Sequence, residues 1–236
     1  MLLRRAQEAL AIIEGTKDEI DEIQGLRKEK LNVGGSGLAA SFLPAAIQTF
    51  KRAHPEIEVT LTIDRSRNLE NGLLEGDLDI GVLSHVHSPL LAHTLYGEDD
   101  LIVIASPNHP LTKKHSVPLE LLAREPSVMF ERGGLMYDMI QRRFAESRIS
   151  FNPTLEVKTR SIARDAIKSA VSNGIGIGFI AKRHVEADIK AGRLKRLKVP
   201  EFNLKRQMYV VTHKKRNSGT PVKEFKDFLL QYKNEG

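Results

Sequence analysis

The sequence predicts an α/β fold made of two similar lobes that face each other across a cleft, preceded by a separate helix. Three observations lead to this prediction. Apolar runs typical of buried strands alternate with amphipathic helical segments. The connections between them are short, which favours parallel strands joined by crossover helices. The length of 236 residues accommodates two small lobes, each with its own core.

The first segment, residues 1–25, is predicted to form a helix with one apolar seam. Its apolar residues recur at spacings of three and four over about three heptads, as in coiled coils. A single helix cannot bury such a seam, so it packs either on its own domain or against a partner helix. We favour the partner helix and assign these residues to a linker and dimerisation helix. The seam consists of Leu3, Ala6, Leu10, Ile13, Ile20 and Ile23.

The first lobe alternates strands and helices. A helix is expected at 39–53, with Pro44 in the first turns, where proline is tolerated. A second helix at 69–74 ends before Gly76, which suits the left-handed position after a last turn. Strands are predicted at the apolar runs 31–34, 57–63, 78–83 and 101–105.

The second lobe repeats the order of strand, glycine-bearing turn and helix. Gly133 and Gly134 precede one helix, and Asn173-Gly174 ends another. The predicted helices are 118–123, 135–147, 162–172 and the terminal 220–230, and the predicted strands are 127–130, 155–159, 175–180 and 208–212.

The composition excludes several classes of protein. The chain has no cysteine, which rules out disulfides, thiolate metal sites and cysteine nucleophiles. No apolar run approaches the roughly 18 residues of a membrane span, and the N-terminus lacks a signal-peptide core, so we expect a cytoplasmic protein without membrane contact. Residues 182–236 hold 15 Lys or Arg against 6 Asp or Glu. Because aromatic residues do not alternate regularly with these charges, as base stacking would need, a solvated face is favoured over a nucleic-acid surface.

Motifs for catalysis, cofactors and metals are not convincing. The glycine-rich run at 174–178 follows a helix and precedes a strand, the reverse of a dinucleotide fingerprint, so it predicts a helix cap and a close-packed strand. His85 and His87 lack a third ligand and fit a solvated loop. The acidic run at 98–100 fits a solvated turn. We therefore expect no cofactor, no metal and no catalytic residue.

Three helix N-termini have the composition of anion-binding sites. Gly35-Ser36-Gly37, Arg132-Gly133-Gly134 and Thr159-Arg160-Ser161 each precede a predicted helix, whose first N–H groups lack partners within the helix. Either the serines simply cap their helices, or the three ends serve one cleft that holds a small carboxylate or similar anion. The residues alone leave both possibilities open.

Several segments also share the order and spacing of one known family. They are LNVGGS at 31–36, FLP at 42–44, FKRAHPEI at 50–57, LEGDLDIGV at 74–82, EDDLIV at 98–103, HPL at 109–111 and VSNGIGI at 171–177. Over about residues 31–230 the chain resembles the effector-binding domain of LysR-type transcriptional regulators.

The resemblance implies an architecture and partners. Two Rossmann-like subdomains, as in type 2 periplasmic binding proteins, would close around an effector. Subdomain I would be 31–105 plus 207–236 and subdomain II 106–206. Residues 1–25 resemble the linker helix that pairs between subunits, which implies a homodimer or homotetramer. The family reaches promoter DNA through a winged helix-turn-helix that the given sequence does not include, so effector sensing and oligomerisation are the functions expected here.

The resemblance places the effector contacts in the turn after the first strand and before the helix around Ala166. A bulky residue at Ser36 is expected to abolish the ligand response and leave the fold intact. Ala181 stands where many members have proline. The full candidate set is Ser36, Gly37, Leu38, Ser66, Ser84, Arg132, Gly133, Gly134, Thr159 and Ser161.

The predicted function is therefore an effector-sensing regulatory domain that binds a small anionic metabolite and is not an enzyme. The alternative is a solute-binding protein of a transport system, which shares the two-lobe architecture. The heptad helix and the lack of a signal peptide argue against it. A small α/β enzyme acting on an anionic substrate would need an acid–base pair that the sequence does not offer.

Overall fold

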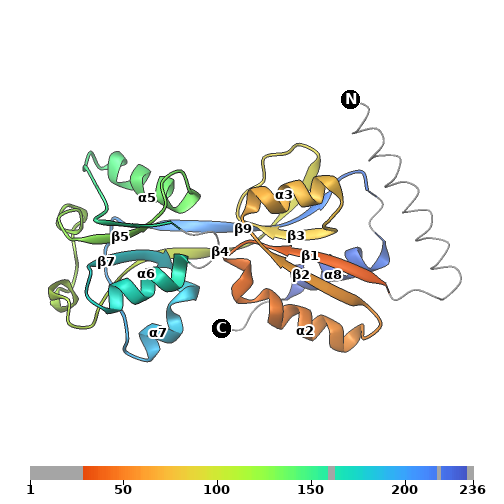
Figure 1. The fold of residues 1–236 in the computed structure, drawn as a ribbon, viewed down its shortest axis with the longest axis horizontal. Coiled ribbons are helices and arrows are strands. Elements are labelled where there is room, and N and C mark those ends of the chain that lie inside the picture. The colour runs from red at the N-terminus through yellow and green to blue at the C-terminus, as the bar shows by residue number, and fades with distance from the viewer. Residues whose placement is uncertain (1–28, 159–162, 217–218, 233–236) are drawn as a thin grey trace, which may run out of the picture. The chain divides into compact units, whose positions relative to one another are not determined.

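The computed structural model describes residues 29–158, 163–216 and 219–232. The predicted helix at 1–25 lies outside these ranges. The chain divides into two compact units, Met1–Gly97 with Met208–Gly236, and Glu98–Gln207. Residues 98–105 thus belong to the second unit rather than to the first lobe as expected, because Leu101–Ile104 pair with a strand of the second unit. Both units contain sheets covered by helices, which confirms the α/β class (Figure 1).

The first unit is built on a sheet with the strand order β2-β1-β3-β9. The first three strands are parallel, and β9 runs antiparallel to β3. The chain moves from β1 outward to β2 and then back to β3, so right-handed crossovers place α2 and α3 on opposite faces of this sheet (Figure 1). Its elements are β1 (Lys30–Gly35), η1 (Ala39–Ser41), α2 (Leu43–Ala53), β2 (Glu58–Ile63), α3 (Ser66–Glu75), β3 (Ile80–Leu83) and α8 (Thr220–Gln231).

Helix α2 differs in one respect from the single helix predicted at 39–53. The chain forms a 3-10 turn first, and the α-helix begins only at Leu43. Pro44 explains this, because its ring blocks a preceding turn of α-helix and its nitrogen has no hydrogen to donate. The buried face of α2 packs on α8 through Phe50 and Phe225, whose ring centroids lie 4.9 Å apart.

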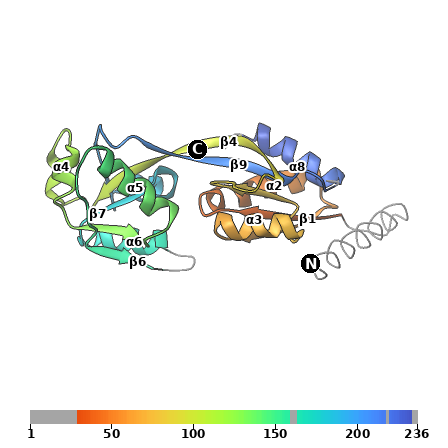
Figure 2. The same ribbon diagram turned by 90° about the horizontal axis from the view of Figure 1, so that it is seen from above.

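The second unit is built on a sheet with the strand order β4-β7-β5-β6, and β8 pairs with β4. Strand β5 is parallel to β6 and β7, whereas β4 is antiparallel to β7. Two long strands, β4 and β9, continue from one unit into the other (Figure 2). The elements are β4 (Leu91–Ala105), η2 (Pro110–Lys113), α4 (Leu119–Leu122), β5 (Ser127–Phe130), α5 (Leu135–Glu146), β6 (Leu155–Val157), α6 (Ala163–Ser172), β7 (Ile177–Ala181), η3 (Lys182–His184), α7 (Glu186–Lys190), β8 (Lys195–Leu197) and β9 (Leu204–His213).

An aromatic cluster forms the core of the second unit. Phe144 and Phe151 stack with centroids 4.2 Å apart, and Phe179 meets both rings edge-on. All three are buried. This cluster packs α5 against the sheet.

The helices of both units are short. The longest in the part of the chain that the structure describes, α5 and α8, have 12 residues each. Across the described ranges, no helix combines the length and the apolar character that crossing a membrane requires.

Candidate functional site

Three of the predicted site residues lie together in the first unit. Ser36 directly follows β1, Ser84 directly follows β3, and Ser66 begins the helix after β2. The Ser36 and Ser84 hydroxyl oxygens are 3.2 Å apart, and the Ser66 hydroxyl accepts the Ser84 N–H at 3.1 Å. All three side chains are buried. We call Ser36, Ser66 and Ser84 the serine cluster.

The place of the serine cluster in the sheet follows from the strand order. The chain leaving β1 leads through α2 to β2 on one side, and the chain leaving β3 leads to β4 on the other side of the strand order, so the carboxyl ends of these two neighbouring strands form a topological switch point. Open α/β sheets bind their ligands at such points. Ser36 and Ser84 stand on its two sides, and the Ser36 N–H extends the ladder by bonding the Val82 carbonyl at 2.9 Å.

The chemistry of the serine cluster suits a small oxygen-rich anion. A hydroxyl provides one donor and two acceptor sites. The bond between Ser36 and Ser84 uses one of their two hydrogens, and Ser66 acts as acceptor towards Ser84, so its own hydrogen is not used in that bond. A carboxylate that displaces the Ser36–Ser84 bond would receive donors from both strand ends, and hydrogen bonds to ionised acceptors are the stronger kind.

The other two predicted residues of this turn take different positions. A Cβ atom placed on Gly37 would meet no atom within 4 Å, so the backbone is open to close approach there. The Leu38 side chain is fully buried in the core. Only its backbone is therefore placed to contact a ligand, and its carbonyl already accepts the Ser41 hydroxyl at 2.8 Å.

A buried carboxylate that the sequence analysis did not single out positions the loop after β3. Glu70 of α3 accepts the N–H groups of His87 and Ser88 at 3.0 and 2.5 Å, and its other oxygen is 3.5 Å from His87 Nδ1. The sequence signal that could have identified Glu70 is its place, as an acidic residue, on the buried face of an amphipathic helix. His87 itself is largely exposed, as predicted for a loop, and the described residues contain no group of three or more metal-ligating side chains.

In the second unit, the turn at 132–134 is largely committed to local contacts. Arg132 lies 3.5 Å from the Glu156 carboxylate and 6.0 Å from the Tyr137 ring centre. Gly133 adopts φ of 75°, and Gly134 precedes α5 with its carbonyl accepting the Asp138 N–H at 3.0 Å. The backbone geometry fits a helix start, whereas the arginine charge is shared with Glu156. Thr159 and Ser161 lie outside the described residues.

The acidic run at 98–100 is not the solvated turn that the sequence analysis expected. It lies inside β4, and Asp99 is buried. Burial raises the pKa of the Asp99 carboxyl, and Arg183 and Arg206 partly offset that rise. The exposed Glu98 accepts hydrogen bonds from the side chains of Lys205 and Gln207 on β9, each at 3.1 Å.

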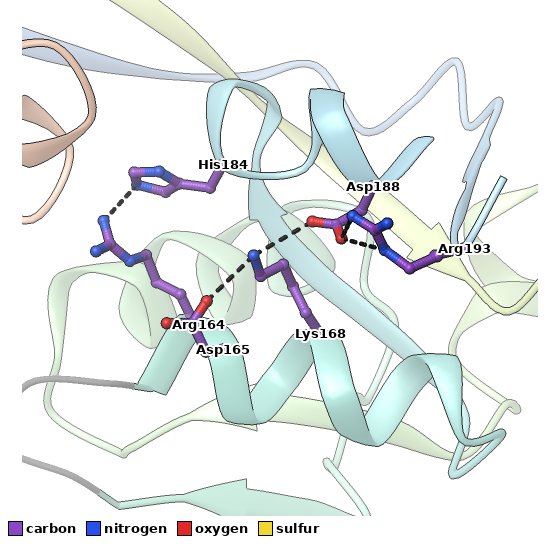
Figure 3. Close-up of polar contacts among 6 residues, drawn as sticks. All are labelled: Arg164, Asp165, Lys168, His184, Asp188 and Arg193. Carbon is purple, nitrogen blue, oxygen red and sulfur yellow. Dashed lines mark hydrogen bonds and ion pairs between the residues drawn. The ribbon is translucent and has the colours of Figure 1, made fainter. Parts of the chain in front are cut away.

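A further charged group in the second unit surrounds His184 (Figure 3). Its Nε2 lies 3.2 Å from Nη1 of Arg164 on α6. Lys168, one turn further along α6, bridges Asp165 and Asp188, and Asp188 also binds Arg193. Burial and then the fields of Arg164, Arg206, Lys168 and Arg183 lower the pKa of His184 to about 3.

This depressed pKa predicts acid sensitivity. Because the unfolded histidine titrates near 6.5, the unfolded chain takes up the proton first, and stability present above pH 6.5 falls as the pH approaches 3. Between pH 6.5 and 5 the loss from this group is about 1–2 kcal/mol. Urea unfolding at pH 6.5 and pH 5 measures this loss. Between these two pH values, the free energy of unfolding of His184→Gln is expected to fall by about 1–2 kcal/mol less than that of the wild type. An equal loss in both proteins would contradict the assignment.

The comparisons with known proteins agree on one family. The family model of the LysR substrate binding domain matches residues 24–234. The HTH-type transcriptional activator CmpR of Synechocystis is 27% identical, over 98% of this chain and 75% of the relative. Such relatives favour a regulator over a solute-binding protein of a transport system.

Two solved structures share the fold. The CcmR regulatory domain of Synechocystis, in complex with 2-PG, has a TM-score of 0.77 at 24% identity and covers 86% of this chain and 96% of its own. The BenM effector-binding domain with benzoate has a TM-score of 0.71 at 19% identity, over 86% and 91% of the two chains. With the family model spanning nearly the whole chain, this protein belongs to the LysR substrate-binding domain family, the effector-binding domains of LysR-type transcriptional regulators.

Proposed function

We propose that this domain senses a small anionic metabolite through the serine cluster of its first unit. The two similar structures were solved with 2-PG (2-phosphoglycolate) and benzoate, and both ligands carry a carboxylate. The carboxylate is therefore the group we assign to the serine cluster. Identities of 24% and 19% transfer the fold, so the identity of the metabolite has to come from experiment.

The observation that carries the proposal is the convergence of Ser36 and Ser84 at the switch point of β1 and β3. These residues are 48 positions apart in the sequence and meet only because the two strands are neighbours. If Ser36 served only as a helix cap, it would need neither Ser84 on the neighbouring strand nor the hydroxyl of Ser66, the third in the cluster.

The regulatory mechanism that we propose is a shift of population. A ligand moves a conformational equilibrium only by its differential affinity for the two states. Binding at the strand ends would favour one arrangement of the regulator, which we place in the cytoplasm as a homodimer or homotetramer. The oligomer would contact promoter DNA through the family's winged helix-turn-helix. The proposal assigns no catalytic step to the chain.

A thermal-shift screen tests the proposal. The panel contains small aliphatic acids including 2-phosphoglycolate, aromatic acids including benzoate, amino acids, and chloride at matched ionic strength. A ligand at 100 times its Kd stabilises the folded state by about 2.7 kcal/mol, and a domain of this size gains roughly 2–4 °C in Tm per kcal/mol. We therefore expect at least one carboxylate to raise the Tm by roughly 5 °C or more. No shift with any acid would contradict the proposal.

Light scattering on the liganded protein distinguishes a transcriptional regulator from a solute-binding protein of a transport system. A regulator is expected to be a dimer or larger. A strict monomer with a tightly bound acid would instead favour a solute-binding protein.

A further inference from the structure

An exposed basic patch of the second unit takes no part in the proposed effector site, which lies in the first unit. Two segments form it: residues 113–115, at the end of η2 and directly after it, and residues 195–198, in β8 and directly after it. Cα atoms of η2 and β8 approach within 8 Å, and the Val117 N–H donates to the Lys198 carbonyl at 2.9 Å, so the two segments lie side by side. We call their exposed basic side chains the basic patch: Lys113, Lys114, His115, Lys195, Arg196 and Lys198.

The basic patch lacks the carboxylates that accompany other cations of this unit. Residues 101–119 and 189–200, which contain the patch, hold no Asp or Glu, and Glu120 and Glu201 just beyond them are exposed. In the part of the chain that the structure describes, none of the patch side chains forms an ion pair. The fold therefore leaves this positive charge to the solvent. Six other cations of the same unit do pair with carboxylates: Arg132, Arg143, Lys168, Lys182, Arg193 and Lys205.

We infer that the basic patch binds the phosphate backbone of duplex DNA, as a contact separate from the family's winged helix-turn-helix. Lys and Arg side chains that neutralise phosphates release condensed counterions, and this release drives binding without reading the base sequence. Because the patch side chains pair with no carboxylate of the described residues, DNA would not have to displace one. The two segments also lie within about one Debye length of each other, roughly 10 Å at about 0.1 M salt, so their fields add.

The composition of the two segments favours a duplex over a single strand. Residues 101–119 and 189–200 hold no Phe, Tyr or Trp. That absence counts against single-stranded nucleic acid, whose bases stack on aromatic side chains, and not against a duplex, whose phosphates need only cations. The proposed function places this domain in an oligomer on promoter DNA. The inference rests on that part of the proposed function and not on the effector site.

The burial pattern of the same segments argues against an acidic protein as the partner. The core of a protein interface consists of apolar and aromatic anchors that become buried. The large apolar side chains next to the patch, those of Leu111, Val117, Leu194 and Leu197, are already buried in the unit's own core. The patch thus offers exposed charge without an apolar anchor, which is the composition that suits a phosphate backbone.

Fluorescence anisotropy with a labelled duplex of about two helical turns tests the inference on the whole chain. The duplex has an arbitrary sequence, because the expected contact does not read bases. At about 20 mM salt we expect a Kd on the order of 10–100 µM. As the salt concentration rises, the logarithm of the affinity should fall linearly with its logarithm. The expected slope is about −3 to −4.5, since each neutralised phosphate contributes about 0.9.

Two double variants remove charge from the two halves of the patch. Lys113→Gln with Lys114→Gln, and Lys195→Gln with Arg196→Gln, should each weaken duplex binding at least tenfold. Each pair should also reduce the magnitude of the salt slope by about 2, because each lost phosphate contact accounts for about 1. All four side chains are exposed, so both variants should fold, which thermal unfolding verifies.

A matched variant and two other polyanions serve as controls. Lys214→Gln with Lys215→Gln removes the same net charge from another pair of adjacent exposed lysines, in the first unit, and should bind the duplex within about twofold of the wild type. Single-stranded DNA of the same sequence and poly-glutamate of similar charge should both bind more weakly than the duplex. The carboxylate screen does not involve the basic patch, so a failure of DNA binding and a failure of effector binding are distinguishable.

Three results would overturn the inference. One is the absence of duplex binding by the wild type at about 20 mM salt with protein up to roughly ten times the expected Kd. Another is equal weakening by the patch variants and by the first-unit control, which would indicate attraction by net charge alone. The third is tighter binding of poly-glutamate or of single-stranded DNA than of the duplex, which would assign the patch to an acidic protein or to a single strand.

Discussion

Replacing Gly176 with alanine is expected to destabilise the second unit by about 3 kcal/mol, the largest stability effect that we anticipate. Gly176 adopts φ of 152°, a backbone conformation that residues with a side chain rarely adopt. A Cβ atom there would lie 2.0 Å from the carbonyl oxygen of Pro126, which also accepts the Ile177 N–H at 2.9 Å. The backbone of β7 would have to move away from the start of β5. Thermal unfolding should show a Tm lowered by roughly 6–12 °C.

Gly174→Ala is the matched control, two residues earlier in the same run. Gly174 also has a positive φ, 83°, but a Cβ atom there would meet no atom within 4 Å. The conformational cost alone is about 1 kcal/mol. Equal effects of the two substitutions would show that the close approach to Pro126 is not what requires glycine at 176.

The second large effect concerns ligand binding, and it is expected from Ser36→Ala. If a carboxylate replaces the Ser36–Ser84 bond, loss of one hydroxyl removes a hydrogen bond to a charged acceptor. Such a bond contributes about 1.5–3 kcal/mol, so the Kd of the best-binding acid should rise roughly 10- to 150-fold. Calorimetric titration measures this directly. Ser84→Ala should have an effect of similar size.

The alanine variant replaces the bulky substitution that the sequence alone suggested. Ser36 is only 3% exposed, so a large side chain there would strain the fold as well as block the ligand. Ser41→Ala is the control, because Ser41 lies in the same segment, is exposed and bonds only the Leu38 carbonyl in the described contacts. A Kd that does not change in Ser36→Ala, or that rises equally in Ser41→Ala, would contradict the serine assignment.

The elements that the sequence predicts well are those with strong local signals. Gly76 ends α3 in the left-handed conformation with φ of 96°, as its position after the apolar run indicates. Strand β5 has the predicted bounds, 127–130. Strand β4 was predicted only at 101–105, because its first ten residues are mostly polar and partly exposed and therefore lack the pattern of a buried strand.

The residues of the candidate site also divide into those with a local sequence signal and those without one. Ser36 and Ser84 could be found because each directly follows an apolar strand, and parallel strands end at one edge. Glu70, Arg164, His184 and Arg206 could not be found in this way. They come from two helices, a 3-10 turn and a strand, and the fields of Arg164 and Arg206 act on His184 only because the packed fold brings their elements together.

The measurement that tests the central claim most directly is amide chemical-shift mapping by NMR, with the best-binding acid titrated into the whole chain. The proposed function predicts that the largest shifts fall on the amides of Ser36, Gly37 and Ser84, at the ends of β1 and β3, and saturate with the Kd found by calorimetry. Saturable binding whose largest shifts lie elsewhere, with these three amides unmoved, would contradict the assignment of the effector site to the serine cluster.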